Sequence, residues 1–178
     1  MQTDRTFAII PAGPSDAAEL ARVHVQAWRE TYPGILPRGY LERMSTPLHA
    51  RRWRARLMRM NEITLAAEGP DGLVGYASGQ DGRDQNGADE GEVTTLYVLN
   101  QAQGGGVGRA LMTGVVRALA DRGARSLVVW VLRENRRARG FYERLGGLAA
   151  ETRGEHVGGG AVPSIAYRWP DIRVLTRP

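Results

Sequence analysis

The junction at residues 92–112 constrains this chain more than any other part of its sequence. Residues 93–99 are mostly apolar or β-branched, which predicts a strand, and a helix is predicted to begin near Val107. Glycines occupy positions 104, 105, 106 and 108 of this junction. Glycine lets the backbone approach a ligand closely, and the N-terminus of a helix carries about half a positive charge. The junction is therefore typical of a site that binds a phosphate group.

Two common phosphate-binding patterns are absent from this junction. Gly108 is followed by Arg109 and Ala110 instead of Lys and Ser or Thr, which excludes a nucleotide P-loop. No register through the glycines supplies Gly-x-Gly-x-x-Gly, which excludes a dinucleotide fingerprint. The residues from Gln103 to Gly108 do follow the pattern Gln/Arg-x-x-Gly-x-Gly/Ala. Taken alone, this loop also fits a purely structural turn between a strand and a helix.

The elements around the junction predict one mixed sheet. Ser15 and Asp16 are candidate caps for the first helix, because their side chains can accept from its free amides. Strands are expected at 7–11, 63–67, 73–78, 92–99, 126–131, 148–156 and 162–169, and helices at 17–32, 37–44, 47–60, 107–122 and 136–145. This order predicts an α/β (α+β) fold with a mixed central sheet of about six to seven strands flanked by helices.

A second motif follows the strand at 126–131. Asn135 precedes a helix that carries Phe-Tyr-Glu at 141–143 and ends in Leu-Gly at 145–146. Together with Leu-Tyr-Val at 96–98 and the glycine loop, this motif resembles the Gcn5-related N-acetyltransferase (GNAT) superfamily. The resemblance covers roughly residues 5–168, and the predicted element order is the one expected of the GNAT fold. It implies an acetyl-CoA-dependent enzyme that transfers an acetyl group directly to an amine.

The resemblance assigns the cofactor to the strand, the loop and the start of the following helices. The cofactor-binding residues that it implies are Leu96, Tyr97, Val98, Gln103, Gly104, Gly105, Gly106, Val107, Gly108, Arg109 and Asn135. Backbone N–H groups near Val98 would hold the pantetheine arm and polarise the thioester carbonyl. The Asn135 side chain would hydrogen-bond the same arm or the backbone beside it.

Two residues are the catalytic candidates that the resemblance implies. Tyr142 would lie near the cofactor sulfur and act as general acid. A phenol (pKa ~10) is a weaker acid than a thiol (pKa ~8.5), so we expect either a hydrogen bond to the thiolate or a lowered pKa of the tyrosine. Glu92 lies eleven residues before Gln103 and is the candidate base. Without the resemblance, Tyr142 also fits a packed core aromatic and Glu92 a solvated carboxylate.

The acceptor is expected to be an amine of a small molecule or of a peptide or protein. Trp28 and Tyr32 lie in the helical region that borders the acceptor site in the family. The acidic segment at 81–92 could attract a cationic amine, although it also fits a solvated hairpin tip. The alternatives are a non-catalytic acyl-CoA-binding or sensor domain on the same fold and an enzyme for longer acyl-CoA donors. A homodimer is implied only by analogy.

The sequence departs from the family pattern at two places. Arg or Lys often stands where this chain has Gly104 and Gly105, so the charge contact must come from Arg109 or elsewhere. Consecutive glycines also make the loop costly to order, which predicts that it is mobile when empty and ordered by cofactor. The second departure is Gly147, at a position where the family usually has a large apolar residue.

Composition sets the remaining expectations. The chain of 178 residues, with 42% apolar residues, suits one domain at 1–178, with its core at 5–169 and a C-terminal tail at 170–178. There is no Cys for a covalent intermediate, and the three histidines lack metal-ligand spacing, so no metal is expected. No apolar run approaches ~20 residues and no secretory signal is seen, so we expect a cytoplasmic protein without a membrane partner.

The net charge of +5 comes from 24 arginines against 19 acidic residues, with no Lys. A basic surface attracts polyanions, which include coenzyme A and nucleic acids. The arginine-rich helix at 47–60 has a narrow apolar stripe, as expected of a solvated helix. Because no nucleic-acid-binding motif accompanies it, a nucleic-acid-binding module is a weaker alternative and no nucleic-acid partner is expected.

Overall fold

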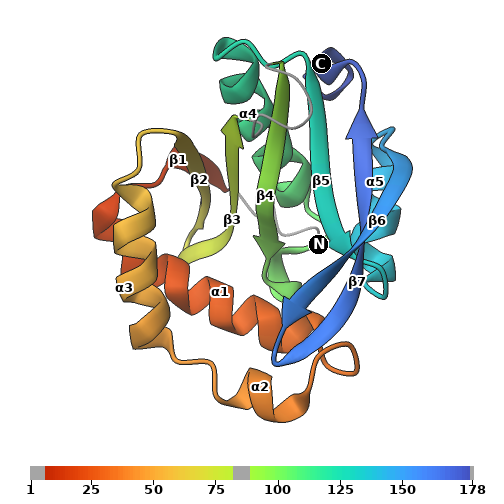
Figure 1. Ribbon diagram of the computed structural model, residues 1–178. Helices are drawn as coiled ribbons and strands as arrows, with labels where there is room; N and C mark the ends of the chain where they lie inside the picture. The colour runs from red at the N-terminus through yellow and green to blue at the C-terminus, as the bar shows by residue number, and fades with distance from the viewer. Residues whose placement is uncertain (1–6, 82–88, 177–178) are drawn as a thin grey trace, which may run out of the picture.

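A seven-stranded mixed sheet forms the centre of the computed structural model, which describes residues 7–81 and 89–176 (Figure 1). The strand order is β1-β2-β3-β4-β5-β7-β6. The strands are β1 (Ala8–Pro11), β2 (Glu62–Gly69), β3 (Gly72–Asp81), β4 (Glu90–Val98), β5 (Ser126–Leu132), β6 (Leu148–Val157) and β7 (Gly160–Trp169). Neighbouring strands run antiparallel except β4 and β5, which pair in parallel. The predicted fold class is confirmed.

Helices cover both faces of this sheet (Figure 1). They are α1 (Ala17–Thr31), α2 (Arg38–Glu42), α3 (Thr46–Leu57), α4 (Val107–Asp121) and α5 (Arg136–Arg144). Helices α1 and α3 pack on one face around Trp53 and Tyr76, whereas α4 packs on the other face through Leu111 and Val115. Among the described residues, no helix combines the length and the apolar character that crossing a membrane requires.

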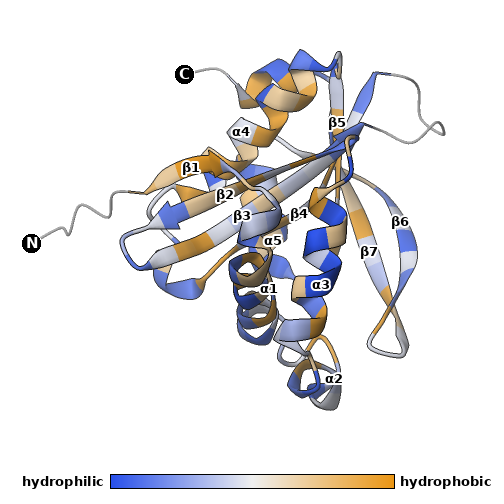
Figure 2. Cartoon of the chain, turned by 90° about the vertical axis from the view of Figure 1, so that its left-hand side faces the viewer, coloured by the Kyte–Doolittle hydropathy of each residue, from blue (hydrophilic) through white to orange (hydrophobic). Residues whose placement is uncertain are grey.

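Helix α3 is largely hydrophilic, as its arginines predict (Figure 2). Its buried side chain is Trp53, which packs into the cluster beneath α1. Ser45 caps this helix by accepting from the amide of Leu48 at 3.4 Å. One capping prediction was wrong: the carboxylate of Asp16 accepts from the amide of Gly13 at 2.8 Å and gives α1 no cap. A short 3₁₀ turn precedes α1, and Asp16 closes that turn.

The segment at 172–175 is part of the core, which corrects the prediction that the core ends at residue 169. A 3₁₀ segment, Ile172–Leu175, places both of its terminal side chains in the cluster beneath α4. The hydroxyl of Thr113 donates to the carbonyl of Leu175 at 3.1 Å. Apolar burial therefore holds this segment against α4, and the core extends to residue 175.

Trp169 explains why a glycine is tolerated at position 147. A Cβ built on Gly147 would lie 2.6 Å from the Trp169 ring and 3.0 Å from the carbonyl of Tyr142. The same indole donates to the carbonyl of Leu145 at 2.9 Å. The Trp169 ring thus fills the space that a large residue at position 147 would need.

Candidate functional site

A pocket of about 430 Å³ lies where β4 separates from β5. The two strands pair only from Glu90 to Val93 on β4 and from Ser126 to Val129 on β5. Beyond these pairs they diverge, as Figure 1 shows, and both contribute lining residues. The glycine loop, α5 and the end of α1 complete the lining. The pocket therefore brings together segments that are far apart in the sequence.

The glycine loop ends in a helix N-terminus at this pocket. Gly106 caps α4 with a φ of 85°, a left-handed conformation that favours glycine. The first bond after the cap runs from the amide of Ala110 to the carbonyl of Gly106 at 3.0 Å. The three preceding amides, at positions 107–109, have no carbonyl partner within the helix. This arrangement can bind an anion such as a phosphate.

The Gln103 side chain joins the loop to the end of β4. Its Nε2 donates to the carbonyl of Val98 at 2.7 Å and to Oδ1 of Asn100 at 3.2 Å. These bonds hold the start of the loop against the strand whose residues line the pocket. The predicted mobility of the empty loop stays a prediction.

Arginines from α4 and α5 supply the positive charge that the loop itself lacks. Arg109, Arg137 and Arg144 all line the pocket. Arg137 also donates to Oδ1 of Asn100 at 3.3 Å, which holds it beside the loop. Arg109 was predicted for the site from the sequence, whereas the two arginines of α5 were not. A possible signal for Arg137 was the run of arginines that follows Asn135, whereas Arg144 directly follows the Phe-Tyr-Glu motif.

Asn135 positions the helix that carries Tyr142. Its Oδ1 accepts from the amide of Ala138 at 3.1 Å and so caps α5. The other end of α5 is held by Tyr167, whose hydroxyl donates to Glu143 at 2.5 Å. Asn135 and Tyr142 both line the pocket and are buried. Local capping and one long-range bond thus orient Tyr142 toward the pocket.

Three tyrosines contribute to the lining of the pocket. The hydroxyl groups of Tyr32 and Tyr97 lie 2.8 Å apart, and both residues line the pocket beside Tyr142. Burial raises the pKa of Tyr142 above the usual range of a phenol, and the nearby Tyr32 adds to the effect. The alternative of a lowered pKa for this tyrosine is therefore wrong. Tyr142 is a neutral phenol that can donate a hydrogen bond.

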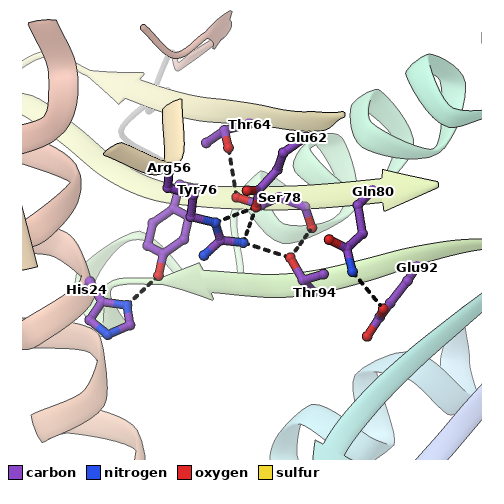
Figure 3. A network of polar contacts seen from close by, with 9 residues as sticks. All are labelled: His24, Arg56, Glu62, Thr64, Tyr76, Ser78, Gln80, Glu92 and Thr94. Atoms are coloured by element: carbon purple, nitrogen blue, oxygen red, sulfur yellow. Dashed lines mark hydrogen bonds and ion pairs between the residues drawn. The ribbon is translucent and has the colours of Figure 1, made fainter. Parts of the chain in front are cut away.

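Glu92 lies on β4 outside the lining of the pocket. It is half-buried, and its Oε2 accepts from the side-chain amide of Gln80 at 3.1 Å (Figure 3). Within residues 7–81 and 89–176, no ion pair involves this carboxylate. It is thus a carboxylate without a cationic partner in that part of the chain, near the point where the two strands separate.

Most of the residues predicted for the site line the pocket. These are Tyr32, Leu96, Tyr97, Val98, Gln103, Gly104, Gly106, Gly108, Arg109, Asn135 and Tyr142. Four others do not line it, namely Trp28, Glu92, Gly105 and Val107. Val107 is buried in the core, Gly105 is exposed to solvent, and Trp28 packs against the rings of Tyr32 and Tyr40. The position of Glu92 on β4 is described above. The pocket also takes in Thr94 and Trp130, which the sequence analysis did not single out.

Two other predictions concern regions away from this lining. The acidic segment at 81–92 falls largely at 82–88, outside the described residues. In the part of the chain that is described, no group of three or more His, Cys, Asp or Glu side chains could hold a metal ion.

His24 packs among the rings of Trp28, Trp53, Tyr76 and Tyr97. Its environment predicts that the stability of the fold depends on pH. Its Nδ1 lies 2.6 Å from the hydroxyl of Tyr76, and burial, with smaller contributions from His49 and Arg56, lowers its pKa to about 3. An unfolded histidine has a pKa of ~6.5, so between these values the unfolded chain binds a proton that the folded chain does not. Acidification below ~6.5 therefore destabilises the fold, by roughly 1 kcal/mol per pH unit.

This dependence can be measured by urea unfolding between pH 5 and 7. We expect the free energy of unfolding of the wild type to fall as the pH falls, and the slope to be smaller for His24→Gln. Part of the slope should remain, because burial also lowers the pKa of His49. An identical slope in wild type and variant would show that His24 takes up its proton in the folded state.

Comparison with known proteins identifies a family whose model matches this chain. The sequence matches the model of the acetyltransferase (GNAT) family over residues 24–147. A relative from Bacillus subtilis (strain 168), named Uncharacterized N-acetyltransferase YuaI, is 28% identical over 160 residues, which are 90% of this chain and 91% of the relative.

Solved structures share the fold. The PaiA N-acetyltransferase of Thermoplasma acidophilum, in complex with coenzyme A, aligns with a TM-score of 0.72 at 18% identity, over 92% of this chain and 99% of that one. YncA of Salmonella typhimurium, with its cofactor acetyl-CoA, aligns with a TM-score of 0.68 at 20% identity, over 92% and 93% of the two chains.

Proposed function

The chain belongs to the acetyltransferase (GNAT) family, and on this premise we propose that it is an N-acetyltransferase that transfers the acetyl group of acetyl-CoA directly to an amine. One observation carries the proposal: the pocket between β4 and β5 has a helix N-terminus in its lining and a buried phenol, Tyr142, beside it. The first can hold a phosphate and the second can donate a hydrogen bond. An acyl-CoA needs both, because it has a pyrophosphate at one end and a thioester at the other.

The residues present fit this donor. The amides at positions 107–109 and the guanidinium groups of Arg109, Arg137 and Arg144 would hold the phosphates. The edge of β4 that β5 leaves free, at residues 94–98, has backbone groups for the pantetheine arm. The complexes of PaiA with coenzyme A and of YncA with acetyl-CoA support the same choice of ligand.

The reaction requires a bond between the amine nitrogen and the acetyl carbon, and loss of the carbon–sulfur bond. The amine gives up one proton, and the sulfur departs as a thiolate that takes up a proton from solvent. In this proposal Glu92 takes the amine proton, directly or through water, and the phenol of Tyr142 stabilises the sulfur by hydrogen bonding. The raised pKa of Tyr142 favours this bond over full transfer of the phenolic proton.

Two measurements on the wild type test the proposal. Calorimetry should detect binding of acetyl-CoA, and longer acyl-CoA donors would show the chain length that the pocket accepts. A thiol-release assay should then find turnover with at least one member of a panel of polyamines, amino acids, lysine peptides and peptides with free N-termini. Binding without thiol release above background would favour the alternative of an acyl-CoA sensor, and absence of binding would contradict both.

Replacement of Glu92 with Gln tests the base. The change preserves shape and removes the proton acceptor, so we expect kcat/KM for the amine to fall about tenfold or more. The affinity for acetyl-CoA should stay unchanged, because Glu92 does not line the pocket. Glu68→Gln, at an exposed position of β2, is the matched control and should leave kcat/KM unchanged. Wild-type kcat/KM in Glu92→Gln would assign the base to water or to another group.

A further inference from the structure

The backbone of β4 changes its pairing on both sides at Thr94. On the β5 side, parallel pairing ends at Val93. On the β3 side, Gly79 pairs with Val93 and Ser78 pairs with Thr95, so Thr94 is an extra residue without a partner. Such a β-bulge bends its strand and increases the local twist. The path that β4 takes away from β5 is therefore set at this residue.

A side chain from α3 binds this unpaired residue. The Nη2 of Arg56 donates to Oγ1 of Thr94 at 2.8 Å, and the same hydroxyl donates to the carbonyl of Ser78 at 3.3 Å (Figure 3). The hydroxyl thus links the guanidinium to the backbone of β3. Thr94 also lines the pocket, so the contact reaches the cleft from the α3 face of the sheet.

The guanidinium of Arg56 is itself held firmly. It forms an ion pair with the carboxylate of Glu62, whose side chain is only 7% exposed. It also lies 4.8 Å from the centre of the buried Trp53 ring. A charged hydrogen bond in a partly buried place is stronger and better oriented than one in water. These contacts hold the Arg56 side chain in place, in contrast to the exposed arginines of α3.

We propose that Arg56 is a positioning residue for the acyl-CoA pocket: it holds the bulged Thr94 and so sets the angle at which β4 leaves β5. The identity of the ligand rests on the proposed function. The backbone just after Thr94 is the edge left free for the pantetheine arm, so a change in this angle moves the thioester relative to Tyr142. A displacement of about 1 Å can reduce the rate of an enzyme by up to about 10²-fold.

Substitutions at Thr94 test the contact without disturbing the ion pair. Thr94→Val keeps the branched shape and removes the hydroxyl, and we expect kcat to fall about tenfold or more. Thr94→Ser keeps the hydroxyl and should restore most of the wild-type kcat. Thr152→Val, the same change at an exposed position of β6, is the matched control and should leave kcat unchanged.

A double-mutant cycle with Arg56→Met separates positioning from general stability. If Arg56 acts through the Thr94 hydroxyl, Thr94→Val should lower kcat much less in the Arg56→Met background than in the wild type. Because Arg56→Met leaves Glu62 without its partner and could impair folding, circular dichroism and the affinity for acetyl-CoA are measured for every variant. Should Arg56→Met not fold, the comparison of Thr94→Val with Thr94→Ser still tests whether kcat depends on the Thr94 hydroxyl that accepts from Arg56.

The outcomes distinguish this proposal from the proposed function. Wild-type kcat and wild-type affinity for acetyl-CoA in Thr94→Val would overturn the positioning role while leaving the acetyltransferase intact. Equal losses in Thr94→Val and Thr94→Ser, or independent losses in the double mutant, would also overturn it. A wild-type protein that neither binds acetyl-CoA nor releases thiol would overturn both proposals.

Discussion

Replacement of Tyr142 with Phe is expected to lower kcat by about 10²-fold or more while the affinity for acetyl-CoA stays close to that of the wild type. The phenol is buried in the lining of the pocket and its pKa is raised, so it remains a neutral hydrogen-bond donor. Its bond to sulfur gains strength only as negative charge develops, and an interaction of that kind lowers kcat when removed. The aromatic ring, which packs near Tyr167 and Trp169, is kept.

The matched control for this variant is Tyr76→Phe. Tyr76 is also a buried tyrosine, but it lies beneath α1, hydrogen-bonded to His24, and outside the lining of the pocket. Removal of its hydroxyl should cost about 1–2 kcal/mol of stability, measured by urea unfolding, without lowering kcat. If Tyr142→Phe retained the wild-type kcat across the amine panel, the proposed hydrogen bond from Tyr142 to the sulfur would not contribute to catalysis. A wild-type rate no higher than background would favour the sensor.

Replacement of Gly106 with Val is expected to weaken the binding of acetyl-CoA by about tenfold to 10²-fold. Gly106 has a φ of 85°, and a β-branched residue in that conformation is strained by roughly 1–3 kcal/mol. No heavy atom lies within 4 Å of a Cβ at this position, so the loop can relax toward an ordinary φ. Binding must then restore the strained backbone at the N-terminus of α4, and every 1.4 kcal/mol is tenfold in affinity.

Gly123→Val provides the control for this strain. Gly123 has a φ of 101°, has no heavy atom within 4 Å of its Cβ position and lies beyond the other end of α4. Both variants should lose similar stability in urea unfolding, but only Gly106→Val should lose affinity in calorimetry. Equal affinities in the two variants would mean that the glycine loop does not contact the ligand.

Local rules were sufficient for most of the fold. The run of apolar and β-branched residues at 93–99 and the glycines at the start of α4 each involve only a few residues, and the predicted strands and helices lie within a few residues of the observed ones. The family was predicted from the same short motifs and is confirmed by the match over residues 24–147. Among the predictions that failed, the cap of α1 by Asp16 concerned a local contact, whereas the end of the core at residue 169 concerned longer-range packing, because the burial of the segment Ile172–Leu175 depends on α4.

The sequence by itself determined a junction with the features of a phosphate-binding site, because the left-handed glycine and the free amides of a helix start are properties of a short segment. Only the tertiary structure decided how this junction becomes a pocket. The register of β4 against β3 and β5 sets the bulge at Thr94, and Arg56 reaches that residue from 38 positions away. The raised pKa of Tyr142 likewise comes from burial. Burial and strand register depend on contacts between distant segments, which local sequence patterns do not specify.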